Sequence, residues 1–485
     1  MKSLRFSLFV LVLLALCSCS KKDYLKVIPA DATVVASVNL RSLAEKSDFA
    51  NAAIMGMMGG NEGDLQKYKD NPMETGIDFE QPLYVFLTRE NLYGIVMKVS
   101  DKGDLEEFFS ALHKQNVVSR PTEHKGLMCG TMGTINYAFN GEALLLLDGV
   151  SGRNASSNLL VKMMDNEGES FADTDAYERM GGADGKDVVV YTNLGYMPAV
   201  LQKEFKAYLQ YGQLKMSDIE FISSLDFVDG SAIVETKWWG RTEKAQKVID
   251  ESKDCWRVID GSYMNDLPQG ALAWIGAGVH GDKFLEKLKG NAQAKEALFL
   301  LERGIDVEQI VRSIDGDVSV VIPATALNGT EVDFAGKAKL KSTSFLAEVD
   351  DWKSGMAEFG ISMRSEGKGA YALSMDGKEI HWGAEGNDLY FATTKAYQQM
   401  QSKGGSAVLK DYEDDIKKCL FFVYVDLQEI QRMNNVATLC AMASNFGVNL
   451  QGMKAIVLKS SAHDEMVLQI DMKNDNENFL KQLFK

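Results

Sequence analysis

Val188-Val189-Val190-Tyr191-Thr192-Asn193-Leu194 decides how this chain is organised, because Phe421-Phe422-Val423-Tyr424-Val425-Asp426-Leu427 repeats its pattern. Each copy is a run of β-branched and aromatic residues that ends in a polar side chain followed by leucine. Such a run predicts a buried strand. A repeated strand is one sign of an internal duplication. A duplication would mean that the chain folds as two similar domains.

Four further pairs of segments repeat in the same order. They are 28–32 with 267–271, 76–81 with 304–309, 135–142 with 380–387, and 233–235 with 467–469. The separation drifts as loop insertions would make it drift, while the order is kept. Five ordered matches predict a tandem duplication, with the boundary near residues 250–266.

Hairpins dominate the pattern inside one copy. Leu83–Leu87 with Tyr93–Val99, and Glu220–Phe227 with Ser231–Trp238, read as paired strands, and Asn140-Gly141 is a strong hairpin turn. Helices come singly between them, as at Asp104–Lys114. We therefore expect an α+β protein of two tandem similar domains, 27–255 and 264–485, each a largely antiparallel sheet with helices packed on one face.

The amino-terminal segment has the features of a secretory signal peptide, residues 1–18. Lys2 and Arg5 precede a short apolar run from Leu8 to Leu16, which is too short to span a bilayer. Leu16-Cys17-Ser18-Cys19 then fits a lipobox, with an aliphatic residue and a small residue before Cys19. Cys17 is a weaker candidate for acylation because Leu16, directly before it, is not small.

Acylation of Cys19 would attach the mature chain to a membrane through fatty acids such as palmitate, followed by a polar tether over residues 19–26. Ser20, in place of an aspartate, favours sorting to the outer membrane. We expect an outer-membrane lipoprotein of the cell envelope. Its exposure on the periplasmic face or on the cell surface stays open.

Charge and length restrict the function further. Without residues 1–18 the chain has 52 − 2 = 50 basic and 68 acidic residues, a formal charge of −18. A nucleic-acid partner is not expected, because no basic stripe is visible. The mature length exceeds what a single core usually organises, which agrees with two domains.

No cofactor or metal site is expected. Gly276-Ala277-Gly278-Val279-His280-Gly281 has the glycine spacing of a dinucleotide loop, but the next strand starts too late for a compact βαβ unit. We interpret it as a glycine-rich turn from a strand to a helix. The five histidines are scattered, without the clustered ligands that zinc needs.

Four cysteines remain besides the two near the lipobox, namely Cys129, Cys255, Cys419 and Cys440. Four cysteines allow three pairings, and their spacing does not choose among them. Cys440 lies in an apolar run, which favours a buried free thiol.

Tryptophans are the remaining candidates for ligand contact. Trp238, Trp239 and Trp352 could stack on a sugar ring, and adjacent residues of a strand point to opposite faces, so that one of Trp238 and Trp239 is expected at the surface. Core packing is the competing interpretation for most of the six tryptophans.

The opening Tyr24-Leu25-Lys26-Val27-Ile28-Pro29-Ala30-Asp31-Ala32, following the lipobox and basic tether, resembles a family of Bacteroidetes lipoproteins of unknown function. The strand and helix start at Val34–Leu43 and the restart at Leu267-Pro268 also match. The resemblance implies the location and the fold. It brings no catalytic residue with it.

These features predict a lipid-anchored envelope protein with a binding or structural role, and not an enzyme. Its expected partners are the membrane, through the anchor, and a glycan or another envelope protein. The alternative is a hydrolase of glycan or peptidoglycan with a carboxylate pair in a cleft between the copies. A third interpretation, an assembly partner, predicts an exposed apolar patch.

Overall fold

The computed structural model describes most of the chain from Asp23 to Phe484. The described residues are 23–47, 65–149, 153–166, 168–181, 185–200, 202, 213–266, 270–290, 295, 298, 305–323, 333–357, 360–375, 377–394, 396, 408–445 and 447–484. The predicted signal peptide, Cys19 and the restart at Leu267-Pro268 lie outside them.

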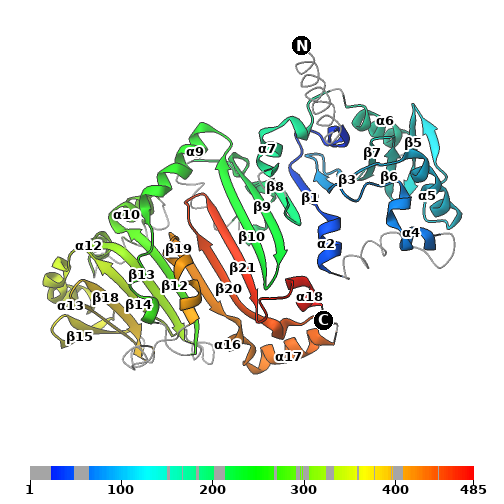
Figure 1. Cartoon of the computed structure of the whole chain (residues 1–485). Helices are drawn as coiled ribbons and strands as arrows, with labels where there is room; N and C mark the ends of the chain where they lie inside the picture. The colour runs from blue at the N-terminus through cyan, green and yellow to red at the C-terminus, as the bar shows by residue number, and fades with distance from the viewer. Residues whose placement is uncertain are drawn as a thin grey trace, which may run out of the picture. The chain divides into compact units, whose positions relative to one another are not determined.

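The chain forms two compact units (Figure 1). The first contains residues 1–196 and 221–226, and the second contains residues 197–220 and 227–485. The boundary between these units lies nearer the amino terminus than the boundary predicted for the repeat at residues 250–266. A compact unit and a repeat are different properties, so the domain bounds 27–255 and 264–485 stay a prediction.

The first unit holds an antiparallel sheet of eight consecutively numbered strands. Its strands are β1 (Val34–Val38), β2 (Leu83–Leu87), β3 (Tyr93–Lys98), β4 (Thr122–His124), β5 (Leu127–Met132), β6 (Ile135–Phe139), β7 (Ala143–Asp148) and β8 (Val188–Asn193). Their spatial order is β4-β5-β6-β7-β3-β2-β1-β8, and each neighbouring pair is antiparallel.

Single helices connect the strands of the first unit. They are α2 (Leu40–Lys46), α4 (Gln66–Asp70), α5 (Lys102–Lys114), α6 (Arg153–Met164) and α7 (Asp175–Gly181). Helix α5 begins at its N-cap Asp101, whose side chain accepts from the backbone N–H groups of Gly103 and Asp104. Phe108 and Phe109 on its buried face pack against Tyr137 and Phe139 of β6.

The second unit holds a wider antiparallel sheet. Its strands are β10 (Ser231–Gly240), β11 (Trp256–Arg257), β12 (Ala271–His280), β13 (Ile314–Pro323), β14 (Ala335–Leu340), β15 (Ser362–Gly367), β16 (Ala370–Met375), β17 (Lys378–Glu385), β18 (Asp388–Thr393), β19 (Phe421–Asp426), β20 (Met453–Ser460) and β21 (Glu465–Met472). Their order is β10-β21-β20-β19-β12-β13-β14-β18-β17-β16-β15, and β11 pairs with β12.

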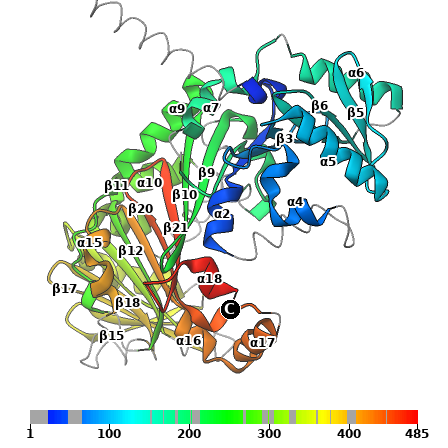
Figure 2. The same ribbon diagram turned by 45° about the vertical axis from the view of Figure 1, so that its right-hand side comes forward.

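Strand β9 (Ile219–Val228) is shared between the two units by residue number. The helices of the second unit are α9 (Glu243–Asp250), α10 (Gly281–Gly290), α12 (Val307–Ser313), α13 (Val349–Ala357), α15 (Glu413–Ile416), α16 (Leu427–Gln431), α17 (Asn434–Ser444) and α18 (Phe479–Leu483). Figure 2 shows α16 and α17 at the end of β20. Two buried clusters form the core: Trp274 with Phe422 and Tyr424, and Trp352 with Trp382 and Phe345.

The α+β class and the large antiparallel sheet are confirmed. The hairpin predicted at 83–99 is β2–β3, and the turn predicted at Asn140-Gly141 joins β6 to β7. The Asn140 side chain accepts from the N–H groups of Glu142 and Ala143, which explains why asparagine suits this turn. The matched apolar runs at 188–193 and 421–426 are the strands β8 and β19, as predicted.

One matched pair differs locally. Residues 76–81 lead directly into β2, whereas Asp306 caps α12, which fills the chain between Gln309 and β13. The Asp306 side chain accepts from the N–H of Gln309. Helix α12 therefore accounts for part of the drift in the separation between the matched segments.

Candidate functional site

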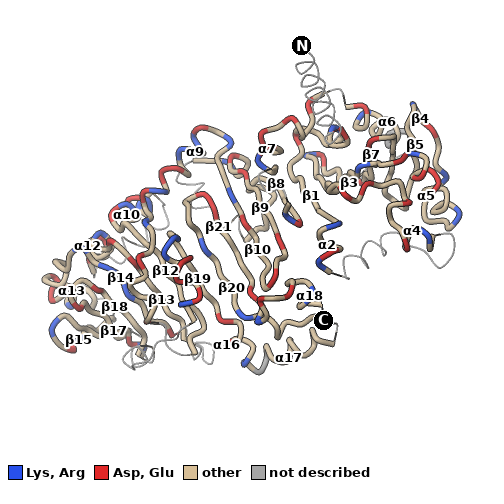
Figure 3. The backbone as a smooth tube through the Cα atoms, in the orientation of Figure 1, with Lys and Arg blue, Asp and Glu red and all other residues tan. Residues whose placement is uncertain are grey.

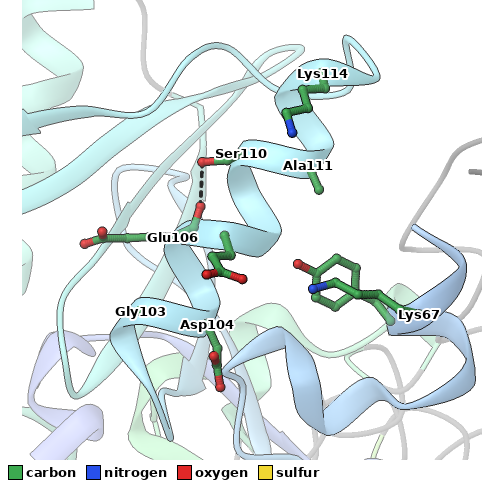
Figure 4. Close-up of a pocket in the computed structure, with 9 residues that line it drawn as sticks. Lys67, Gly103, Asp104, Glu106, Ser110, Ala111 and Lys114 are labelled. Carbon is green, nitrogen blue, oxygen red and sulfur yellow. Dashed lines mark hydrogen bonds between the residues drawn. The ribbon is translucent and has the colours of Figure 1, made fainter. Parts of the chain in front are cut away.

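A surface cavity of about 910 Å³ lies between α4 and α5 of the first unit (Figure 4). Its lining combines three acids, two lysines, a tyrosine, a serine and two small residues: Lys67, Tyr68, Gly103, Asp104, Glu106, Glu107, Ser110, Ala111 and Lys114. Figure 4 shows Lys67 projecting from α4 towards α5, and Lys114 at the end of α5.

The chemistry of this lining suits binding. Ser110 Oγ donates to the Glu106 backbone oxygen at 2.7 Å, so that its hydroxyl has a partner on its own helix. Lys67 Nζ lies 4.5 Å from the centre of the Tyr68 ring, a cation–π distance. The nine lining residues include no imidazole or thiol, and the Ser110 hydroxyl is hydrogen-bonded to its own helix and not to a lining carboxylate. A polar ligand carrying charge fits such a lining.

A charged network lies in the first unit, between α2 and the sheet. Lys46 Nζ donates to both oxygens of Asp187, at 2.8 and 2.9 Å, and to Asp226 Oδ1 at 2.8 Å. Ser42 Oγ donates to Asp187 Oδ1 at 2.6 Å. The Asp187 side chain is fully buried. The network fastens a helix to the strand edge with charged groups that lie far apart in the sequence.

The electrostatics of this network favour the ionised forms of Lys46 and Asp226. Burial opposes the charge on Lys46, but its hydrogen bonds to Asp187 and Asp226 raise the pKa of Lys46 above the ordinary value. Burial likewise opposes the charge on Asp226, but the hydrogen bond and charge of Lys46 lower the pKa of that carboxyl. The result is a stable ion pair at neutral pH. It offers no group poised for proton transfer.

A pair of carboxyl groups, Asp260 and Asp317, occurs in the second unit. Asp317, on β13, is buried, and its oxygens accept from the backbone N–H groups of Asp260, Gly261 and Ser262, at 2.9, 2.9 and 3.0 Å. Asp317 therefore holds the turn at residues 260–262, where Gly261 adopts a φ of 87°. Asp260 is exposed at the same turn and accepts from Ser262.

The two carboxyl groups of this pair have opposite pKa shifts. Burial and the neighbouring Asp260 raise the pKa of Asp317 to about 6, although the three backbone donors stabilise its ionised form. The hydrogen bond with Asp317 lowers the pKa of Asp260. Carboxyl groups with separated pKa values are typical of acid–base sites. Here the buried member is already engaged by three backbone donors of a turn.

The tryptophan candidates lie in different surroundings. Trp352 on α13 is only 7 % exposed and stacks between Phe345 and Trp382. Trp238 and Trp239 are both partly exposed on β10, and Trp239 Nε1 donates to Glu220 Oε2 at 3.0 Å. The structure therefore does not bring Trp352 together with an exposed stacking surface. A ligand role for Trp238 and Trp239 stays a prediction.

The glycines at 276–281 serve close packing. A Cβ on Gly276 would come within 2.1 Å of the Trp274 ring, and a Cβ on Gly281 within 1.9 Å of the Val311 backbone oxygen. Residues 276–280 are the end of β12 and Gly281 begins α10, so the predicted glycine-rich turn is wrong, although the segment does pass from a strand to a helix. Close approach of the Trp274 ring and of the Val311 backbone therefore requires glycine at positions 276 and 281.

Cys129, Cys255, Cys419 and Cys440 are free and buried, so the thiol predicted at Cys440 is confirmed. Burial raises the pKa of the Cys419 thiol to about 11, which keeps it protonated at neutral pH. In the described part of the chain, no three His, Cys, Asp or Glu side chains are grouped as a metal site. No described helix is long and apolar enough to cross a bilayer.

Sequence reasoning missed the Lys46–Asp187–Asp226 network and the cavity between α4 and α5. A lone acid directly before an apolar strand, as Asp187 is before β8, was the available signal. Its partners come from distant segments, so the contact depends on strand pairing. The cavity residues Lys67 and Glu107 are equally unremarkable as sequence, since charged residues usually form solvated helix faces.

Among solved structures, the chain is similar to three crystal forms of TP0453. Form I shares 11 % identity, with a TM-score of 0.29, over 48 % of this chain and 85 % of that one. Form III shares 13 %, with a TM-score of 0.29, over 47 % and 83 %, and form IV shares 11 %, with a TM-score of 0.28, over 44 % and 79 %. No curated protein matches. The family model of a domain of unknown function, DUF4836, matches residues 24–480, and the chain belongs to that family.

Proposed function

We propose that this chain is a lipid-anchored protein of the bacterial outer membrane, with a binding or structural role in the cell envelope. The observation that carries the proposal is the sequence Leu16-Cys17-Ser18-Cys19 after a short apolar run. Acylation of Cys19 would hold the folded units at the membrane, on its periplasmic face or at the cell surface. The proposal also places the chain among the Bacteroidetes lipoproteins that its opening residues resemble.

We infer that the two halves are copies of one α+β plan. Strands β1 to β8 follow one another in space as β4-β5-β6-β7-β3-β2-β1-β8, and β12 to β19 follow as β15-β16-β17-β18-β14-β13-β12-β19. Numbered from the first strand of each half, these orders are the same. An unrelated fold would reproduce an eight-strand order only by coincidence.

Backbone hydrogen bonds support the same inference. The N–H of Asn39 donates to Asp187 O at 2.8 Å, and the N–H of Gly278 donates to Leu420 O at 3.0 Å. Val34 starts the pairing of β1 with β8, and Ala273 starts the pairing of β12 with β19. Asn39 lies five residues after Val34, and Gly278 lies five residues after Ala273. The matched bonds join the same positions of the two plans.

The pairing of β10 with β21 agrees with the matched segments 233–235 and 467–469. Val234 pairs with Leu468, its own counterpart in the repeat, while Ile233 pairs with Gln469 and Glu235 with Val467. A ladder centred on equivalent residues is what two copies related by a local two-fold axis would form. This supports duplication from a contact that is independent of the strand order.

The cavity between α4 and α5, lined by acids, lysines and a tyrosine, supports a binding role for a polar ligand. A glycan or another envelope protein is the proposed partner. The second candidate is the hydrolase, which the separated pKa values of Asp260 and Asp317 favour. Incubation of the protein with peptidoglycan tests it: release of soluble fragments that stops in D260N would establish the hydrolase and overturn the binding role.

The anchor itself is tested by labelling with a palmitate analogue in an expressing bacterium. We expect the natural chain to carry the label and to fractionate with the outer membrane. C19S should lose both properties, and C17S should keep both. The C17S variant is the matched control because it changes the neighbouring cysteine. Unlabelled natural chain, or loss of label in C17S alone, would contradict the proposal.

A further inference from the structure

Helix α17 presents large apolar side chains to solvent. Leu439 is 60 % exposed and Met442 is 54 % exposed, and they lie about one turn apart, so they share a face. Cys440, on the opposite face of the helix, is buried. An exposed pair of large apolar residues on a surface helix marks a contact with something outside the described fold.

The chain around α17 carries no charge. Residues 433–453 contain no Asp, Glu, Lys or Arg, in a chain where these make up 25 % of the residues. Figure 3 shows α17 as an uncoloured segment, with charged residues only beyond its ends. The rest of the sequence gives a formal charge of −16, so this surface is distinct in character. An uncharged surface is complementary to an uncharged phase.

The equivalent connection of the first half also exposes large apolar side chains, although its sequence includes charged residues such as Lys215 and Asp218. It runs from β8 to β9, as the connection with α17 runs from β19 to β20, and it exposes Val200 and Met216. Half of the ten large apolar side chains that are exposed in the described residues lie in these two connections: Tyr196, Val200, Met216, Leu439 and Met442. Their place in the plan, after the last strand of each eight-strand set, makes a shared role the simplest account.

We propose that the surface of Leu439 and Met442 on α17 lies in the lipid interface of the membrane that holds the chain. The inference rests on the proposed lipid anchor. The fatty acids on Cys19 would keep the chain at the membrane surface, where an uncharged helix face with apolar side chains can also contact lipid. Two side chains on a helix of 11 residues provide such a contact.

The size of the surface favours lipid over a second copy of the chain. A stable protein interface buries about 800 Å² on each partner. One face of an 11-residue helix with two large exposed apolar side chains is far smaller than that. Lipid needs neither a large area nor directional contacts.

The test uses the mature chain, residues 19–485, carrying Cys19→Ser, so that no acyl group contributes. Its partition onto vesicles of phosphatidylethanolamine with a minor share of phosphatidylglycerol is measured by flotation. We expect binding that falls about tenfold in the double variant L439S/M442S, because two apolar side chains leave the lipid. The matched control is Y93S/V258S, which removes two similarly exposed apolar side chains elsewhere and should leave binding unchanged.

Equal partition of L439S/M442S and its parent, or no partition of the parent, would overturn the inference. A parent that sediments as a dimer, with a monomeric L439S/M442S variant, would overturn it in favour of a second copy. The anchor fails separately: absence of palmitate label on Cys19 contradicts the proposed function, whereas vesicle binding of the Cys19→Ser chain does not depend on the label.

Discussion

Helices α2 and α10 follow the first strand of each half, yet they are fixed to their sheets by different chemistry. Lys46 on α2 forms ion pairs with Asp187 and Asp226. Leu285 on α10, as far beyond Ala273 as Lys46 is beyond Val34, is fully buried and apolar. Leu420 likewise occupies the place of Asp187. One backbone arrangement therefore accepts either a buried ion network or an apolar contact.

On the inferred duplication, the two halves keep the same backbone pairing at these positions while the polarity of the side chains differs. Aromatic packing is likewise found at the helix after the third strand of each half, where Phe109 of α5 packs on Tyr137 and Trp352 of α13 packs on Trp382. Aromatic bulk is present in both places. This explains why Trp352, a ligand candidate by sequence, is a core residue.

The largest effect is expected from removing that bulk. Trp352→Ala and Phe109→Ala should each lower the free energy of unfolding of their unit by about 4 kcal/mol, through lost burial and the cavity left behind. All six tryptophans lie in the second unit, so their fluorescence during urea unfolding follows that unit, and hydrogen exchange of β6 peptides follows the first. A loss below about 1 kcal/mol in either unit would mean that the aromatic pairs are not equivalent.

The next effect is expected at the ion network. Lys46→Met should cost about 3 kcal/mol, because it leaves the carboxylates of Asp187 and Asp226 without their shared cation in a largely buried place. The double variant K46L/D187L copies the leucines of the second half and should recover most of that loss. Hydrogen exchange of β1 and β8 peptides measures both.

A matched control for the network is Lys102→Met, whose lysine lies 3.5 Å from Glu106 in an exposed pair. We expect a change below about 1 kcal/mol there. If K46L/D187L were less stable than K46M, the idea that the plan accepts either chemistry would be wrong.

A smaller, pH-dependent effect is expected at Asp317. Its pKa is raised to about 6 in the folded chain. As the pH rises, the unfolded state therefore loses this proton at a lower pH than the folded state does. The contribution of Asp317 to stability therefore falls as pH rises from about 4 to 6, on the order of 1 kcal/mol. In D317N, urea unfolding followed by tryptophan fluorescence at pH 4.5 and 6.5 should lose this decline, and an unchanged difference would refute it.

The smallest effect is expected at the tyrosines that precede the first strand of each half. Tyr24 donates to the Pro82 backbone oxygen at 2.9 Å, and Tyr263 donates to Asp388 at 2.7 Å. Burial raises the pKa of both phenols, so both remain donors at neutral pH. Tyr24→Phe and Tyr263→Phe should each cost about 1 kcal/mol in thermal unfolding. No change in either variant would show that the hydroxyl bond is dispensable.

Local pattern was enough to predict the elements. Alternation and turn residues gave the β2–β3 hairpin and the Asn140-Gly141 turn, and the apolar run at 188–193 gave β8 with its bounds. The helix α12 between Asp306 and β13 was not predicted, because a helix of seven residues is too short to show a clear helical pattern in the sequence. Order of similar segments carries more information than their spacing.

Long-range partners could not be predicted. Nothing in residues 93–98 states that β3 pairs with β7 and not with β4, because register is set by the assembled sheet. Lys46 and Asp226 meet for the same reason. The cavity between α4 and α5 depends on helix packing, and Lys67 and Glu107 carry no local mark of it.

Double-cysteine crosslinking at matched strand positions tests most directly that the halves share one plan. Ala36 faces Val190 across β1–β8, and Ile275 faces Val423 across β12–β19, at the distance of directly opposed strand residues. The account predicts that A36C/V190C and I275C/V423C both form disulfides, while the shifted pairs A36C/V189C and I275C/F422C do not. Crosslinking of one in-register pair without the other would contradict it.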